Sequence, residues 1–552
     1  MLIQKITPCE NFAIQRQKLE PTFCGKLPRS FPRPKHIKET FAYRTFKQYT
    51  PLKINFGEYK IPVHNEAIAQ RLKRNYTPEN FKTLFNFAKS KGVFNYTLDS
   101  HTGFVKTSQI NRKENELMSD LIWITDTCHN MPLIKHSDPK SCTKVFNSLT
   151  SLYDKQQKNF DYAIANPQKY KENEFYVAKV GVGHAFIPKT KQDHPWFAHT
   201  RLESVGMYLQ TATDLIEKGF NGANYGYKSF KDIPHNVLET IANSVQYLKA
   251  INYPQARSCG AWEEQTFINS LTSDTSIINE AFRKILHLVY APTNNANTIA
   301  FRDALIKTTK YGKVFSDKEA LIKLLKSGER RIEDTHYHES MHANIKVKPG
   351  LEKCLGRKSD AAMAFAPQTE TFNTNSSAGN AISKMGVLRQ LERDLVRDNG
   401  ALRYKGDEYL NLDYHTLTNH WVNNKKRNEA EWFLVSEIAK GYGKVVSELI
   451  NDIESKGITD QKQKLLIYAI KKETEFINRS YARITPKNSV KSNKYSCPAY
   501  KVPEAYEAIT TDKGIKYVPG AHTPLTWAEA SLFEASTQFY TNLTKLQKLG
   551  LN

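Results

Sequence analysis

The feature that most constrains the fold of this chain is a succession of long amphipathic segments. In each segment, apolar residues recur at spacings of three and four, which places them on one face of an α-helix. Strand-like stretches are few and isolated, so a sheet of alternating strand and helix units is disfavoured. The pattern predicts an all-α, or at least mainly α, fold. The predicted helices cover residues 203–218, 235–251, 273–289, 316–327, 383–398, 429–454 and 460–478, and a last long helix follows them.

Residues typical of helix ends stand beside several of these segments. Ser316 and Glu319 form a capping-box pattern, and Thr523 with Pro524 stands where the last helix would begin. Three glycines stand where left-handed C-caps are expected. They are Gly219, Gly400 and Gly457. So many helix pairs in one chain can close into a helical toroid.

The first 60 residues differ from the rest because prolines are interspersed among basic residues. Proline lacks a backbone donor and fixes φ, which suits an extended segment better than a helix or a central strand. We therefore expect two parts, a basic, proline-rich arm at residues 1–60 and one helical domain at residues 61–552.

The formal net charge of +23 makes polyanions conceivable partners, because a basic surface attracts them at long range. The lysines are spread along the chain without a dense arginine block, so a solvated basic surface is the better interpretation and no nucleic acid is expected. The seven cysteines form no CxxC pair, and their odd number suits a reducing compartment. Neither a signal peptide nor a membrane span is visible, which predicts a cytoplasmic protein.

His338-Glu339-Ser340-Met341-His342 matches the HExxH pattern, in which two imidazoles one helical turn apart bind zinc. The flanking residues are charged on one side and strand-like on the other, and they offer no apolar stripe to bury a zinc-binding helix. We expect a surface loop here and keep a zinc protease as a remote alternative. Neither a metal nor an organic cofactor is expected.

Two glutamates stand in settings that suit the hydrolysis of a glycosidic bond with inversion. This reaction needs one protonated carboxyl for the leaving oxygen and one ionised carboxylate that activates water. Glu263 follows Trp262, whose apolar indole is expected to keep the carboxyl protonated. Glu504 follows Pro503 in a loop and is expected to stay ionised.

Several motifs, in matching order and spacing, resemble those of glucoamylase-type glycoside hydrolases (glycoside hydrolase family 15). Trp262-Glu263-Glu264 resembles the acid motif of the family. Val502-Pro503-Glu504-Ala505-Tyr506, followed by Thr523-Pro524-Leu525-Thr526-Trp527-Ala528, resembles its base loop and final barrel helix. Arg403-Tyr404-Lys405-Gly406-Asp407 is similar to its Arg-Tyr-x-x-Asp, and Trp432-Phe433-Leu434 to its Trp-Phe-Leu.

Further similarities extend the resemblance from about residue 90 to residue 540. The segment from His199 to Leu209 is similar to the family's His-Leu-Gln-x-Asp-Ala segment, and Trp196 then suits a subsite tryptophan. Thr102-Gly103-Phe104 and Lys358-Ser359-Asp360-Ala361-Ala362 bring the chain closest to the branch that contains the phosphorylase kinase α and β subunits.

The resemblance implies an (α/α)6 toroid whose loops at one end form a pocket for the non-reducing end of an α-glucan or maltooligosaccharide. It implies an inverting, exo-acting hydrolase that releases glucose, with Glu263 as general acid and Glu504 as general base, roughly 6.5–9.5 Å apart. The implied substrate-binding residues are Trp123, Asp126, Asp120, Trp196, Glu203, Trp262, Glu264, Arg403, Tyr404, Asp407 and Trp432. The linkage and the oligomeric state are left open.

Two positions depart from the family pattern. The family binds the terminal sugar through Trp-x-Arg-Asp, but this chain reads Trp123-Ile124-Thr125-Asp126, with Asp120 as a competing alignment, so the arginine is missing. Glu203 stands where the family usually has Asp. The resemblance also leaves a non-catalytic alternative open, a regulatory or carbohydrate-sensing protein like the phosphorylase kinase subunits. Retention of both glutamates favours the enzyme.

Each of these residues also has a plain structural interpretation. The alternatives are solvated loop carboxylates for Glu263 and Glu504, core aromatics for Trp123, Trp196 and Trp432, and helix-surface acids for Asp120 and Asp126.

Overall fold

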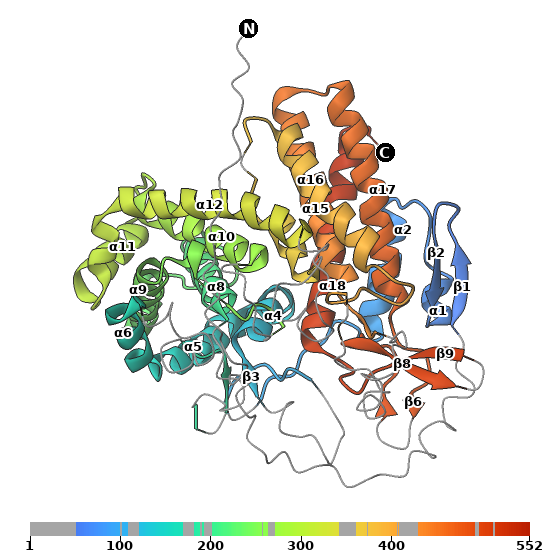
Figure 1. The fold of residues 1–552 in the computed structure, drawn as a ribbon, viewed down its shortest axis with the longest axis horizontal. Coiled ribbons are helices and arrows are strands. Elements are labelled where there is room, and N and C mark those ends of the chain that lie inside the picture. Colours follow the sequence, from blue (N-terminus) through green and yellow to red (C-terminus); the bar gives the residue numbers. More distant parts are fainter. Residues whose placement is uncertain are drawn as a thin grey trace, which may run out of the picture.

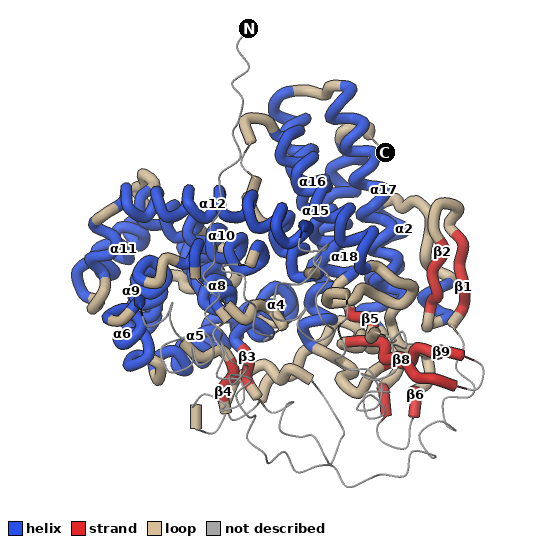
Figure 2. Tube along the Cα trace, viewed as in Figure 1, coloured by secondary structure: helices blue, strands red, loops and turns tan. Residues whose placement is uncertain are grey.

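The computed structural model describes most of the chain after residue 50. The described residues are 51–99, 102–108, 121–168, 182–187, 190–191, 201–256, 258–262, 271–341, 360–372, 374–405, 407, 429–491, 496–511 and 514–551. Within them the chain is mainly α-helical, as the periodicity predicts, and the strands are short (Figures 1 and 2).

In the described part of the chain, six helices form a closed inner ring. Each one contacts the next in chain order, and the last contacts the first. They are α4 (Ile124–Ser137), α8 (Leu202–Phe220), α10 (Thr272–Tyr290), α14 (Phe365–Gln368), α16 (Val435–Lys456) and α18 (Thr526–Lys548). A 3₁₀ turn, Ala361–Ala364, directly precedes the short α14.

Further helices pack against the ring and alternate with its members along the chain. They are α2 (Pro78–Ser90), α5 (Cys142–Asp154), α9 (His235–Ala250), α12 (Lys318–Met341), α15 (Ser377–Leu395) and α17 (Asp460–Ala482). This alternation of inner and outer helices is the (α/α)6 toroid that the sequence predicts. Three smaller helices complete the described set, α1 (Glu66–Ala69), α6 (Gln157–Ala165) and α11 (Ala296–Thr308).

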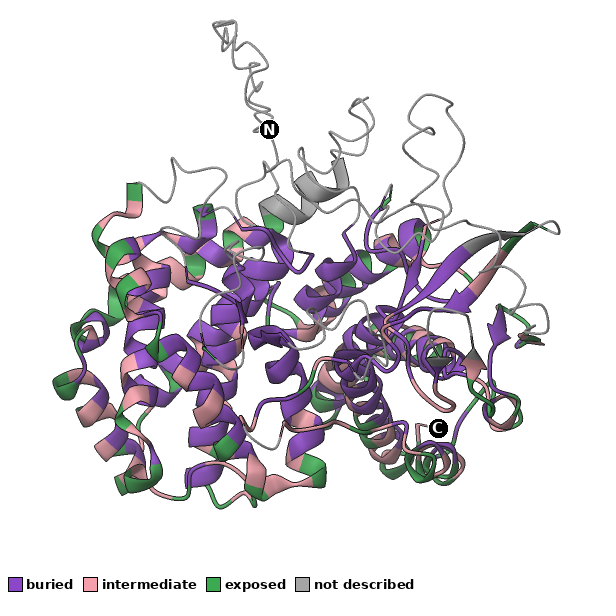
Figure 3. Cartoon of the chain, turned by 90° about the horizontal axis from the view of Figure 1, so that it is seen from below, coloured by how far each residue is buried: buried purple, intermediate pink, exposed green. Residues whose placement is uncertain are grey.

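Burial differs between the two layers. In α10 every residue from Thr272 to Asn279 is buried, although most of them are polar. A helix that is buried on all sides must lie inside the fold. In the outer helix α2, by contrast, the buried residues Phe81, Leu84 and Ala88 recur at a spacing of three or four. Figure 3 shows the same division, with exposed positions gathered at the periphery.

The described strands pair antiparallel in four small sheets: β1 (Leu52–Asn55) with β2 (Lys60–Val63), β3 (Ile122–Trp123) with β4 (Ala185–Phe186), β5 (Glu431–Trp432) with β8 (Ala505–Thr511) and β8 with β9 (Gly514–Pro519), and β6 (Val490–Lys491) with β7 (Ser496–Cys497). β3 and β5 lead directly into the inner helices α4 and α16, so their sheets border the N-terminal ends of the ring. Figure 1 shows them along its lower edge. The division expected after residue 60 falls within β2 and stays a prediction.

Several predicted helix ends are wrong. The helix expected at 316–327 is α12, which runs from Lys318 to Met341. Asp317, not Ser316, caps it, because Asp317 Oδ1 accepts a hydrogen bond from Ala320 N at 2.9 Å. The last helix begins at Thr526 rather than beside Pro524.

The three glycines have different roles. Gly457 is the C-cap of α16 and has a positive φ of +78°, but its ψ of 166° lies outside the left-handed helical region that was expected. Gly219 lies inside α8, where a Cβ atom would stand 2.1 Å from the backbone oxygen of Tyr227. Gly400 lies in a loop, where a Cβ atom would stand 2.3 Å from Nη1 of Arg483. Close packing, not helix capping, therefore explains Gly219 and Gly400.

The prediction of a surface loop at the HExxH motif is also wrong, because α12 continues through residues 338–341. The helix is longer than its weak apolar periodicity predicted. His342 and the side chains of residues 334–341 lie outside the described part, so zinc binding stays untested. None of the helices that the structure describes is long and apolar enough to cross a membrane.

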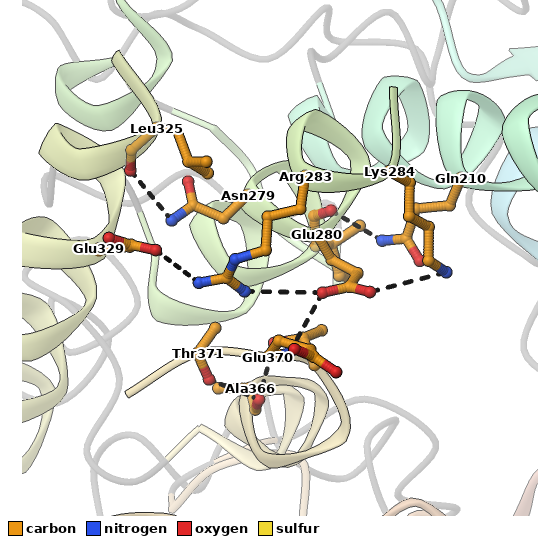
Figure 4. A network of polar contacts seen from close by, with 12 residues as sticks. Gln210, Asn279, Glu280, Arg283, Lys284, Leu325, Glu329, Ala366, Glu370 and Thr371 are labelled. Atoms are coloured by element: carbon orange, nitrogen blue, oxygen red, sulfur yellow. Dashed lines mark hydrogen bonds and ion pairs between the residues drawn. The ribbon is translucent and has the colours of Figure 1, made fainter. Parts of the chain in front are cut away.

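A network of ion pairs and hydrogen bonds joins α10 to α12 and to the loop after the short α14 (Figure 4). Arg283 of α10 donates to Glu329 of α12 at 2.6 Å and lies 3.6 Å from Glu280. Glu280 accepts a hydrogen bond from the backbone N–H of Glu370 at 3.1 Å. Because α14 is short and offers little surface for packing, these contacts help to hold α10 against this part of the ring.

Candidate functional site

The candidate residues gather where the inner helices begin. Each of five inner helices carries a buried acidic residue in its first turn. They are Asp126 in α4, Glu203 in α8, Asp274 in α10, Glu437 in α16 and Glu529 in α18. Helix N-termini favour negative charge, because their free N–H groups point outward. This end of the toroid is therefore built around carboxyl groups.

Arg403 is the centre of an aromatic and ionic cluster. Its guanidinium binds Asp407 through two hydrogen bonds of 2.5 and 2.6 Å. Arg403 Cζ lies 4.6 Å from the ring centroid of Trp432 and 5.5 Å from that of Trp262. It also lies 5.7 Å from the ring of Tyr404. The carboxylate fixes the guanidinium plane, and the guanidinium in turn stacks against two indoles.

Trp262 is held by a second acidic residue. Its indole N–H donates to Asp360 Oδ1 at 2.6 Å, and the same oxygen accepts from the backbone of Ala362 at 2.9 Å. Ala361 N–H donates to the backbone oxygen of Arg403 at 2.7 Å. Asp360 and Ala361, at the start of the 3₁₀ turn that precedes α14, therefore hold both Trp262 and the loop of Arg403 in place.

Glu504 lies on a loop whose main chain is bonded on both sides. Its N–H donates to the backbone oxygen of His522 at 3.0 Å, and its own carbonyl accepts from Phe433 N–H at 3.0 Å. Trp432 pairs with Ala505 across β5 and β8. The Glu504 side chain is half-buried. It is thus fixed next to Trp432 while solvent still reaches it.

The ionisation of Glu504 differs from the sequence prediction. Burial raises the pKa of its carboxyl to about 7, and the charge of Arg403 opposes this shift. The expectation that Glu504 is fully ionised at neutral pH is therefore wrong. The physical reason is burial, which the charge of Arg403 offsets only in part, and the guanidinium of Arg403 is paired with Asp407.

The charges of Glu504 and Arg201 both act on Asp126. Burial raises its pKa to about 7, Arg201 lowers it, and the charge of Glu504 raises it further. Thr125 donates a long hydrogen bond of 3.4 Å to Asp126 Oδ2. Asp126 is buried rather than a helix-surface acid. The arginine that directly precedes α8 thus acts on the aspartate whose own motif lacks one.

Glu203 and Asp274 form a buried acidic pair beside Arg201. Arg201 Nε donates to Glu203 Oε1 at 2.6 Å, and Ser273 donates to Asp274 Oδ1 at 3.0 Å. Burial and the charge of Glu203 raise the pKa of Asp274 well above its usual range. Glu203 Oε2 and Asp274 Oδ2 have no hydrogen-bond partner among the described residues. Hydrogen-bonding capacity is therefore left over at this end of α8 and α10.

Glu437, in the interior of the ring, has a different environment. Trp527 Nε1 donates to it at 3.1 Å, Gln368 at 2.9 Å and Ser531 at 2.5 Å. Lys440 Nζ lies 3.1 Å from its Oε2 atom. Burial alone would raise its pKa, but Lys440, His129 and the hydrogen bonds lower it to about 2. These contacts make Glu437 part of the core.

The structure brings together most of the predicted site residues that it describes. Trp262, Arg403, Tyr404, Asp407, Trp432 and Glu504 form one cluster, and Asp126 and Glu203 lie beside it through Glu504 and Arg201. Trp123 instead packs against His184 with ring centroids 5.6 Å apart. The predicted residues Glu263, Glu264, Asp120 and Trp196 lie outside the described residues.

Sequence reasoning missed Arg201, Asp274, Asp360 and Arg483. Arg201 and Asp360 stand within quoted motifs but were not assigned a role. Asp274 lies in the first turn of an amphipathic helix, where an acidic residue is ordinarily explained by its favourable interaction with the helix N-terminus. Among the described residues, no group of three or more His, Cys, Asp or Glu side chains is arranged to hold a metal ion.

Neither a family model nor a curated protein matches the sequence. Solved structures similar to this chain include one named Glycosidase Wild Type, with a TM-score of 0.46, and two glycosidase variants, with 0.47 and, in complex with glucose, 0.43. Each is 12% identical and aligns with 84% of this chain and 99% of its own. At these TM-scores, function must be argued from the residues of this chain.

Proposed function

We propose that this chain is an inverting, exo-acting α-glucoside hydrolase that releases glucose from the non-reducing end of an α-glucan or maltooligosaccharide. In the proposed reaction Glu504 is the general base and Glu263 the general acid. The observation that carries the proposal joins two segments that are distant in sequence. Trp262, which precedes Glu263, lies beside Arg403 and Trp432. The loop of Glu504 bonds through its main chain to the segment of Trp432, and the charge of Arg403 acts on the Glu504 carboxyl.

The chemistry of the cluster fits this reaction. A half-buried carboxylate next to solvent can accept a proton from water. The indoles of Trp262 and Trp432 offer apolar surface to the C–H groups of a sugar ring. Asp126, Glu203, Arg403 and Asp407 offer hydrogen bonds to its hydroxyls. Asp120, Trp123, Trp196, Glu264 and Tyr404 remain proposed substrate-binding residues on the resemblance.

A panel of purified α-glucosides tests the proposal. We expect glucose to be released from at least one of maltose, maltotriose, isomaltose and trehalose, and the preferred substrate identifies the linkage. The panel is followed by an enzymatic glucose assay, with the same mixtures lacking protein as the control. Release from none of them contradicts the proposed reaction.

The same panel distinguishes the non-catalytic alternative. A regulatory or carbohydrate-sensing protein with this fold would bind an oligosaccharide without hydrolysing it. Calorimetric titration with maltotriose separates the two cases, because binding without glucose release supports the sensing protein and rejects the enzyme.

A further inference from the structure

We propose that Arg483 is a positioning residue that holds Glu504 in place through the main chain of its loop. This inference rests on the proposed role of Glu504 as general base. Arg483 follows α17, a helix of the outer layer, and only 1% of its surface is exposed. It therefore acts through the loop and does not touch the substrate.

The guanidinium of Arg483 joins three segments that each carry a site residue. Its Nη2 donates to the backbone oxygens of Pro503 at 3.2 Å and of Glu504 at 3.5 Å. Its Nη1 donates to the backbone oxygen of Glu431 at 3.1 Å and to that of Asn399. Glu431 precedes Trp432, and Asn399 lies on the loop that leads to Arg403. One side chain thus links the loops of the base, the indole and the arginine.

The burial of the Arg483 charge costs free energy, and a positioning role accounts for this cost. A buried charge is costly unless it is well paired, and the hydrogen bonds that the structure describes for Arg483 all go to carbonyl oxygens. A planar guanidinium can span several carbonyls at fixed angles, whereas an ammonium cannot. The geometry therefore requires arginine rather than any cation.

Neighbouring residues fit around this guanidinium. Arg483 Cζ lies 5.1 Å from the ring centroid of Tyr506, and the Tyr506 hydroxyl donates to the backbone oxygen of Arg483 at 2.9 Å. At Gly400 a Cβ atom would stand 2.3 Å from Arg483 Nη1. A glycine here makes room for the guanidinium, which explains a residue that the sequence pattern assigned to a helix cap.

The first test is Arg483→Lys, which keeps the positive charge and removes the planar guanidinium that spans several carbonyls. The matched control is Arg479→Lys, one turn earlier in α17, where the arginine pairs with Glu475 on the same helix at 2.9 Å. We expect kcat on the best α-glucoside to fall about ten- to a hundredfold, because displacing a catalytic group by about 1 Å costs that much. KM should change little, and the control should match the wild type.

The pH profile separates positioning from a loss of folded protein. Glu504 faces Arg403 and Asp126, and burial raises its pKa. A loosened loop admits water, so the acidic limb of kcat/KM should move to lower pH in Arg483→Lys. If Arg483→Lys only reduces the amount of folded protein, kcat/KM falls by the same factor at every pH and the acidic limb does not move. This result would overturn the proposal.

Hydrogen exchange gives a readout that does not need activity. The amides of Phe433 and Glu504, which donate to Glu504 O and His522 O, should exchange at least about tenfold faster in Arg483→Lys. Unchanged exchange overturns the positioning role even if the wild type hydrolyses no α-glucoside. If Arg483→Lys does not fold, Tyr506→Phe should give a smaller shift of the same kind, and no shift in either amide rejects the proposal.

Discussion

Asp126 and Glu437 occupy equivalent places in the ring, yet their environments act in opposite directions. Each is a buried acid in the first turn of an inner helix, α4 for one and α16 for the other. Glu437 receives three hydrogen bonds and a lysine, and its pKa falls to about 2. Asp126 accepts a long hydrogen bond from Thr125, and burial, assisted by the charge of Glu504 and only partly offset by Arg201, raises its pKa to about 7.

The difference separates carboxyl groups that stabilise the fold from those that remain available. The oxygens of Glu437 are occupied by donors from α14, α16 and α18, so this residue ties three inner helices together. The pKa values of Asp126 and the half-buried Glu504 are raised, and Glu203 Oε2 and Asp274 Oδ2 have no hydrogen-bond partner among the described residues. Perturbed groups of this kind mark sites where a ligand can supply the missing contacts.

The largest effect that the comparison predicts concerns stability. Among the described residues, Glu437→Gln leaves the buried Lys440 with Glu534, at 2.7 Å, as its one carboxylate partner, and should cost about 3 kcal/mol of unfolding free energy. Asp126→Asn removes a carboxyl that burial already drives towards the neutral form, so it should cost less than about 1 kcal/mol. Urea unfolding at neutral pH measures both. Equal losses would break the distinction between the two sites.

The next effect concerns catalysis. Glu504→Gln keeps the shape of the side chain and removes its ability to accept a proton, so kcat should fall at least about a hundredfold. Glu473→Gln is the control, because Glu473 is a glutamate outside the candidate site that is more deeply buried than Glu504 and bonds to Asn542 between α17 and α18. The control should retain full activity, and a fully active Glu504→Gln protein would reject Glu504 as the base.

The pH dependence of activity sharpens the comparison further. Only the ionised form of Glu504 can accept a proton, and its pKa is about 7. Activity should therefore be low in acid and rise through about pH 7. The pH profile of kcat/KM measures this limb. A limb near pH 4.5, the ordinary glutamate range, would show that burial does not govern the base.

The smallest expected effect is on stability against pH. Burial raises the pKa of Glu473 from 4.5 to about 8. Its neutral form is favoured in the folded state, so its contribution to stability is complete below pH 4.5 and is lost as the pH rises through about 8. Glu473→Gln does not ionise and should flatten this decline in urea midpoints measured from pH 5 to 9. Superimposable curves would contradict the assignment.

The periodicity predicted the inner helices α8, α10, α16 and α18, because an amphipathic helix carries its signal locally, but it did not predict α4 or the short α14. Prediction from the sequence failed where the structure of a segment depends on residues far along the chain. Trp432 was placed in a helix, but its segment is a strand because β8, far along the chain, pairs with it. Gly400 was assigned to a cap, because the approach of Arg483 cannot be seen from neighbouring residues.

The candidate site shows the same limit. The motifs located Trp262, Arg403, Trp432 and Glu504, which the structure brings together. The pKa of Glu504 could not be predicted, because it depends on burial and on an arginine that is already bound to Asp407. The influence of Arg201 on Asp126 was missed because the two residues are far apart in the sequence, although Glu203, with which Arg201 also pairs, is close to it.

The most direct test of the central claim is the anomeric form of the glucose first released. Proton NMR during the first minutes of hydrolysis of the best α-glucoside distinguishes the two anomers before mutarotation mixes them. The account predicts β-glucose, because a water activated by Glu504 attacks the face opposite the leaving group. Initial α-glucose would contradict it, because that product requires a retaining mechanism with a covalent intermediate.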